Sequence, residues 1–149
     1  MSLKPPAPES LQKTLDSLLL RFPDLLLIAA SDKDGVNLLV SSRSQLDSKT
    51  ESTHESPINE SKISKESKES HIDGKIASIF SLASEQASKL GLGTNQTITA
   101  FYDDYVVCSV NYFPLVISLV ATAEANEGVL LAIVPKVKLA LEGIKTKLG

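Results

Sequence analysis

The order of apolar and polar positions predicts a helix followed by a β-hairpin at the start of the chain. Leucines spaced three or four residues apart indicate an amphipathic helix over residues 10–22, which Pro23 ends. Residues 25–31 are apolar almost throughout, as expected of a strand that is covered on both faces, and residues 36–41 form a second run. The Asp-Lys-Asp-Gly sequence between the two runs is typical of a tight turn with Gly35 at positive φ.

Residues 42–71 differ from the rest of the chain in composition. Serine, lysine and glutamate dominate this stretch, and few of its side chains are large and apolar. Burial of so little apolar surface does not offset the entropy lost when the backbone is ordered. We therefore expect a disordered insertion at 42–71 within a single domain that spans residues 1–149. Ser48 and Ser52, each followed three residues later by glutamate, are candidate phosphorylation sites, and the simpler alternative is a tolerated surface insertion.

A second amphipathic helix is expected over residues 72–90, before a pair of glycines. Its apolar stripe comprises Ile72, Ile76, Ile79, Phe80, Ala83, Ala87 and Leu90. Gly91 stands where helices commonly end in a left-handed residue, and Leu92 is expected to fold back on the last turn. A phosphate-binding loop runs from a strand into a helix N-terminus, whereas Gly91 and Gly93 follow a helix, so they do not predict a nucleotide site.

Three closely spaced strands and a closing helix complete the predicted order. The strands cover residues 95–102, 105–113 and 115–122. The last strand is the most apolar, which favours a central position in the sheet, and Asp103 and Asp104 form the turn after the first. Residues 129–148 fit a helix, in which Pro135 marks either a kink or the start. The resulting order is helix, two strands, helix, three strands, helix, which indicates an α+β fold.

Composition and charge narrow the function classes further. Apolar residues make up 42% of the chain and charged residues 22%, as in ordinary globular proteins, and a net charge of −3 does not favour nucleic acid as a partner. The only cysteine, Cys108, excludes an internal disulfide and a cysteine-based zinc cluster. No apolar run is long enough to cross a bilayer, so we expect no direct membrane insertion. Any localisation to a membrane would then depend on a partner.

The residues that could carry catalysis do not form a recognisable constellation. His54 and His71 lie in or beside the predicted insertion. The acidic pairs Asp32 with Asp34 and Asp103 with Asp104 lie in expected turns, where aspartate is favoured for backbone reasons. We therefore predict no catalytic residue, no cofactor and no metal site, and we regard the chain as a non-enzyme. The weakest alternative is a hydrolase in which His71 activates a nearby serine.

Three stretches carry a resemblance to a known family. The sequences LLLIAASDKDGVNLLV, SIFSLASEQASKLGLGTNQTITAFYDDYVV and NYFPLVISLVATAEANEGVL resemble the roadblock superfamily, and within it the MAP kinase scaffold subunits of Ragulator complexes. The resemblance covers about residues 11–41 and 72–148. It implies a five-stranded antiparallel sheet, with one helix on one face and the two terminal helices on the other. The serine-rich insertion and the N-terminal proline cluster depart from the family pattern.

The resemblance also implies partners and a location. Members of this family pair with a second roadblock subunit through the middle helix and the third strand of each. The pair is held on late endosomes or lysosomes by a lipidated, membrane-anchored Ragulator subunit. There it supports Rag GTPases in TOR signalling and is linked to MAP kinase kinase and MAP kinase. A different class of function, the direct regulation of nucleotide exchange or hydrolysis by a small GTPase, is the alternative.

The residues themselves favour the same interface. Residues 95–101 carry no charge and follow a helix, so in a meander they form an unprotected edge strand. Such an edge, beside a helix rich in small residues, favours continuation of the sheet by another subunit, unless the insertion or the N-terminus covers it in a monomer. The predicted interface residues are Phe80, Ala83, Ser84, Ala87, Leu90, Thr97, Ile98, Thr99, Ala100 and Phe101.

Overall fold

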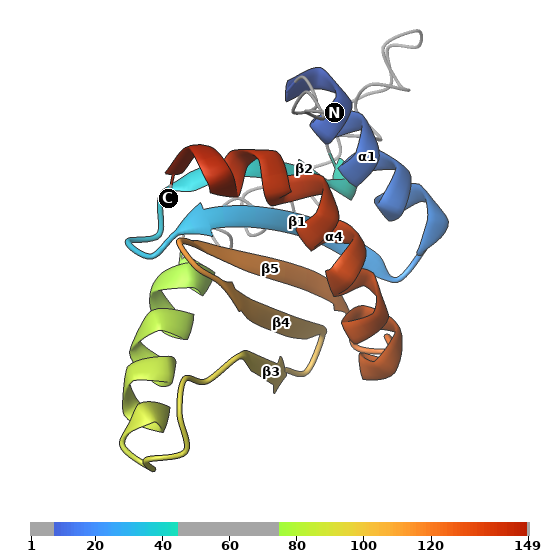
Figure 1. Cartoon of the computed structure of the whole chain (residues 1–149). Helices are drawn as coiled ribbons and strands as arrows, with labels where there is room; N and C mark the ends of the chain where they lie inside the picture. The colour runs from blue at the N-terminus through green and yellow to red at the C-terminus, as the bar shows by residue number, and fades with distance from the viewer. Residues whose placement is uncertain (1–7, 45–74, 149) are drawn as a thin grey trace, which may run out of the picture.

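Five antiparallel strands form one sheet in the order β2-β1-β5-β4-β3 (Figure 1). The computed structural model describes residues 8–44 and 75–148. The strands are β1 (Leu25–Asp32), β2 (Asn37–Ser42), β3 (Thr97–Phe101), β4 (Tyr105–Tyr112) and β5 (Leu115–Thr122). The helices are α1 (Pro8–Arg21), α4 (Glu127–Leu148) and residues 75–88, which we call the middle helix. β5 lies at the centre of the sheet, as its apolar sequence predicted.

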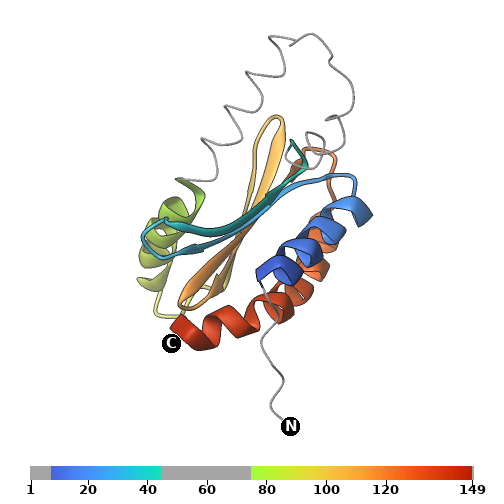
Figure 2. The same ribbon diagram turned by 90° about the horizontal axis from the view of Figure 1, so that it is seen from above.

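The two terminal helices cover one face of the sheet and the middle helix covers the other (Figure 2). On the first face, Leu15 of α1 and Val137 of α4 pack with Ile28 and Leu119 in the larger core cluster. On the second face, Ile76 contacts β1 and β5 in a smaller cluster. Alternation along β1 and β5 supplies both cores, because successive side chains point to opposite faces. This arrangement confirms the predicted fold.

The hairpin between β1 and β2 depends on one aspartate side chain. The Asp32 carboxylate accepts hydrogen bonds from the backbone N–H groups of Asp34 and Val36, both at 2.9 Å. Gly35 follows with φ of 91°, a conformation that glycine adopts without steric cost. The Asp32 side chain therefore serves the backbone of the turn, as the sequence indicated.

The closing helix begins earlier than the sequence suggested. The Asn126 side chain accepts a hydrogen bond from the N–H of Gly128 at 2.8 Å, which caps α4 at its N-terminus. Pro135 therefore lies inside the helix and does not start it. None of the described helices has the length and apolarity that a bilayer crossing requires.

Residues 42–44, which the sequence assigned to the start of the predicted insertion at 42–71, belong to the fold. Ser42 is the last residue of β2 and is buried. The Arg43 guanidinium donates hydrogen bonds to the backbone carbonyls of Leu19, Phe22 and Leu25, around the junction of α1 and β1. Residues 45–71 of the predicted insertion, including both histidines and the candidate phosphorylation sites, lie outside the described residues.

Candidate partner interface

β3 is an edge of the sheet and pairs only with β4 among the described strands. The N–H of Asn111 donates to the carbonyl of Gln96 at 2.8 Å, and the N–H of Tyr102 donates to the carbonyl of Tyr105 at 2.8 Å. Inward and outward main-chain groups alternate along an antiparallel strand. Even-numbered residues therefore bond to β4. The N–H and C=O groups of Thr97, Thr99 and Phe101 face the open edge.

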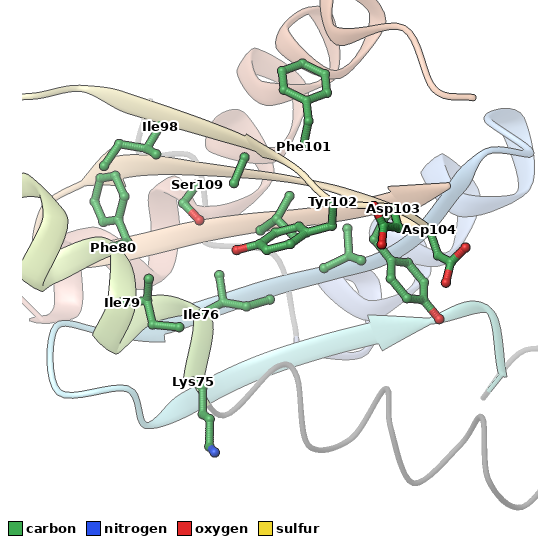
Figure 3. A pocket seen from close by; sticks show the side chains of 14 residues that line it. Lys75, Ile76, Ile79, Phe80, Ile98, Phe101, Tyr102, Asp103, Asp104 and Ser109 are labelled. Carbon is green, nitrogen blue, oxygen red and sulfur yellow. The ribbon is translucent and has the colours of Figure 1, made fainter. Parts of the chain in front are cut away.

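The side chains of β3 divide between the two faces of the sheet. Ile98 packs against Phe80 of the middle helix, and Ala100 lies on the same face. Thr99 lies opposite Cys108 on the face that α1 and α4 cover. Phe101 is 65% exposed and points away from the middle helix in Figure 3. Side chains therefore alternate between the two faces along β3.

The middle helix places the predicted interface residues in different environments. Phe80 is only 5% exposed, so its side chain belongs to the core of this chain. Ala83, Ser84 and Ala87 are half-buried, whereas Leu90 is 74% exposed. The predicted set therefore combines half-buried small residues, the exposed Leu90 in the turn after the helix, and Phe80, which supports the sheet from within.

One exposed side chain of this helix was assigned to the wrong environment from the sequence. Ile79 was placed on the apolar stripe with the core residues, yet it is 57% exposed. It lines a groove together with residues of β3, and it shares its side of the helix with Ala83 by helical spacing. Helical spacing alone does not separate Ile79 from Phe80, because both belong to one apolar stripe of ordinary width.

The middle helix ends at the glycines, as expected. The N–H of Gly91 donates to the carbonyl of Ser88 at 3.1 Å, and Gly91 has φ of 70°. The prediction that Leu92 folds back on the last turn is wrong, because this side chain is 85% exposed. The Asn95 amide donates to the Ser84 hydroxyl at 3.0 Å and so ties the following loop to the helix. This contact fixes where β3 begins relative to the helix.

A groove of about 640 Å³ lies between the middle helix and the end of β3 (Figure 3). Ile76 and Ile79 form its helical wall, and Ala100 and Tyr102 form the opposite wall. Ser109 of β4 contributes to the floor. Sequence reasoning missed this groove, because its walls come from segments that are distant in sequence.

The cysteine of this chain, Cys108, is held in an unreactive setting. Cys108 is fully buried, and desolvation by burial raises the pKa of its thiol. A hydrogen bond with the Thr99 side chain acts in the opposite direction, and the charge of Glu127 raises the pKa further. The thiol therefore stays protonated at neutral pH. Across residues 8–44 and 75–148, no three side chains of the His, Cys, Asp and Glu types cluster as metal ligands would.

Comparison with known proteins places the chain in a family. The model of a family described as "Mitogen-activated protein kinase kinase 1 interacting" matches residues 57–148. The chain belongs to this family. A Drosophila melanogaster relative, "Ragulator complex protein LAMTOR3 homolog", is 32% identical over 141 residues, which cover 92% of this chain and 94% of that protein. The Xenopus tropicalis "Ragulator complex protein LAMTOR3" is 31% identical over 126 residues, which cover 84% of each chain.

Solved structures confirm the roadblock fold for this member of the kinase-kinase-interacting family. A roadblock/LC7 domain from Streptomyces avermitilis aligns with a TM-score of 0.63 at 14% identity and covers 88% of this chain and 93% of its own. A structure titled "MglB with tetrameric arrangement" aligns with a TM-score of 0.66 at 14% identity and covers 99% and 94%. At such low identity these neighbours establish the fold alone.

Proposed function

We propose that this chain is a non-catalytic scaffold subunit that pairs with a second roadblock subunit through β3 and the middle helix. The observation that carries the proposal is the open edge of β3, where Thr97, Thr99 and Phe101 turn their main-chain groups outward. No charged side chain or proline protects this strand. Natural proteins commonly protect such edges, so an unprotected edge favours occupation by a partner strand.

The middle helix supports the same interface from the side of the sheet face. Ile79 of the middle helix is 57% exposed, and Leu90, in the turn that follows the helix, is 74% exposed. Ala83 lies between them and leaves room for a close approach. A joint that includes both the strand and this helix face would bury on the order of 1,600 Å², the size of a standard specific interface.

The family relationship supports the larger assembly. The relatives are named as subunits of the Ragulator complex. We infer a Ragulator-type complex on late endosomes or lysosomes, in which a membrane-anchored subunit holds the pair. The pair would support Rag GTPases in TOR signalling, and the MAP kinase kinase and MAP kinase are further partners. In this role the chain contributes surface and no chemistry.

Affinity purification of the full chain tests the proposal. The wild-type chain should retain one stoichiometric roadblock partner, identified by mass spectrometry. Leu90→Lys should reduce the amount retained by at least about tenfold, because a charge would be buried at the joint. Leu20→Lys is the matched control, since Leu20 of α1 is 68% exposed and lies on the other side of the sheet.

Two results would count against the proposal. Equal partner recovery with Leu90→Lys and Leu20→Lys would remove the helix from the interface. Faster nucleotide release from a small GTPase with the isolated chain would instead favour a direct regulator. That measurement is made with a fluorescent nucleotide, with and without the chain.

A further inference from the structure

We infer that two side chains of α1, Gln12 and Asp16, close the second edge of the sheet against pairing with β2 of another copy of this chain. β2 has only β1 as a neighbour among the described strands, so it is the edge opposite β3. Three strands separate it from β3 (Figure 1). The inference therefore concerns a different surface from the subunit-pairing surface, and it holds whether or not β3 pairs.

The sequence of β2 suits strand pairing. Residues Asn37–Ser42 contain no charge and no proline, which are common protections of an edge strand. Leu38 is 44% exposed, and Val36, just before the strand, is 58% exposed. Two copies of β2 related by a two-fold axis would pair in antiparallel fashion, and neither strand would bring a charge to the joint. A second copy therefore matches this edge unless something blocks it.

One residue in the second half of β2 turns its main-chain groups toward the edge. The N–H of Asp32 donates to the carbonyl of Val36, so even-numbered residues of β1 point their main-chain groups toward β2. Val40 pairs with Ala29, an odd-numbered residue, so the N–H and C=O of Val40 point away from β1. The register shifts next to Ser31, and such an irregularity discourages pairing along the first half of β2. Val40 therefore lies in the part of the edge where a second strand would pair.

The Gln12 side chain occupies the Val40 carbonyl. Its amide nitrogen donates to this carbonyl at 3.3 Å and to the Asp16 carboxylate at 3.1 Å. A side-chain amide has two N–H groups, so both are used. The Asp16 carboxylate also accepts a hydrogen bond from the Ser41 hydroxyl, which ties α1 to β2. Asp16 thus orients the Gln12 amide toward the edge of the strand.

This network protects the edge in two ways. It satisfies the acceptor that a second strand would need, so an incoming strand gains no hydrogen bond at Val40 unless Gln12 moves. It also places the charge of Asp16 beside an uncharged strand, and a second copy would bring a like charge to the joint. β3 differs, because its ladder with β4 is regular from Thr97 to Phe101. The sheet is therefore protected at one edge and open at the other, so assembly through β3 ends with two chains.

Self-association of the full chain tests this role. Every variant carries Thr99→Pro, so that pairing through β3 does not contribute. Gln12→Ala should raise the association constant at least about tenfold over the same chain with Gln12, because each copy regains an outward acceptor. Gln12→Lys is the matched control. Lysine donates to the same acceptors and places a charge on the edge, so this variant should not associate. Sedimentation equilibrium measures the constant.

Two further variants show where the copies meet. Leu38→Lys, added to the Gln12→Ala chain, places a charge on an exposed position of β2 and should return the association constant to the control value. Lys13→Ala removes an exposed side chain from the next position of α1 and should cause no association. Urea denaturation shows whether each variant is folded. If Gln12→Ala is unfolded, Gln12→Met replaces it, because methionine keeps the length of the side chain and has no donor.

Three results would overturn the inference. Equal association constants for Gln12→Ala and Gln12→Lys would show that the amide does not protect the edge. Association that persists with Leu38→Lys would place the contact elsewhere. Association that appears only after deletion of residues 45–69, and not with Gln12→Ala, would assign the protection to that segment. Recovery of a roadblock partner through β3 depends on none of these outcomes, so the two proposals fail separately.

Discussion

A proline at residue 99 offers the sharpest test of the interface. In β3 the N–H of Thr99 faces the open edge. The main-chain hydrogen bonds of Gln96 and Tyr102 to β4 show that even-numbered residues point their N–H and C=O groups toward β4, so odd-numbered residues point theirs away from it. Proline has no N–H, and it is tolerated on edge strands when the missing donor faces outward. Thr99→Pro should therefore block a partner strand and leave the ladder between β3 and β4 intact.

The expected loss follows from the unmade hydrogen bond. Each buried acceptor left without its donor costs about 1–3 kcal/mol, which corresponds to a rise in Kd of about 5- to 150-fold. The proline ring also holds the partner strand away, so the upper part of this range is expected. The isolated chain should lose only about 1 kcal/mol, the span of strand preferences among residues.

Two measurements are needed on each variant. Size exclusion with light scattering and titration calorimetry report the affinity for the partner that copurifies with the wild type. Urea denaturation reports the stability of the isolated chain. Thr99→Val is the matched control, because it keeps the N–H and removes the hydroxyl that bonds the Cys108 thiol.

A second control uses the neighbouring residue. Ile98→Pro removes a donor that faces Ser109 within the sheet, so it should destabilise the isolated chain as well. If Thr99→Pro and Thr99→Val bind the partner equally tightly, β3 does not pair with another strand. The reasoning from the open edge would then be wrong.

Three further predictions concern the stability of the chain itself. Arg43→Leu should lower the free energy of unfolding by about 2–3 kcal/mol, since three backbone carbonyls lose a charged donor; a loss below about 0.5 kcal/mol in urea denaturation would contradict this. Gly91→Ala should cost about 1 kcal/mol, from the positive φ alone, because nothing lies within 4 Å of an added Cβ; a threefold larger loss in the same assay would indicate a steric clash. Burial raises the pKa of the Cys108 thiol in the folded chain. The free energy of unfolding should therefore be unaffected by this group below the ordinary pKa of a thiol, and it should fall at higher pH, where the thiol ionises in the unfolded chain first. A wild-type pH profile of stability that matches that of Cys108→Ala would refute this.

The sequence predicted most of the fold because each element carries a local signal. The turn at Asp32 and Gly35, the helix end at Gly91 and the apolar run of β5 all encode their own backbone conformation. Tertiary contacts moved the element boundaries by one or two residues at most strands. The edge position of β3 also followed from local order, because a meander leaves its first strand without a second neighbour.

The features that escaped prediction depend on contacts between distant residues. Arg43 stands in a polar stretch, and its three acceptors lie 18 to 24 residues earlier, so nothing nearby signals its role. Helical periodicity identified the apolar side of the middle helix, yet only the packing shows that Phe80 is buried and Ile79 is exposed. The groove forms only where the middle helix and β3 lie side by side, and this arrangement depends on tertiary packing.

The anchoring of Arg43 has a practical consequence for protein engineering. Arg43 lies two residues before residue 45, and its guanidinium donates hydrogen bonds to the carbonyls of Leu19, Phe22 and Leu25. A force that pulls on the chain after residue 45 would act on these hydrogen bonds before it acted on the pairing of β1 with β2. A reporter domain inserted after Ser44 should therefore leave the sheet folded and the β3 edge able to bind a partner. This position is a suitable attachment point for sensors of complex assembly.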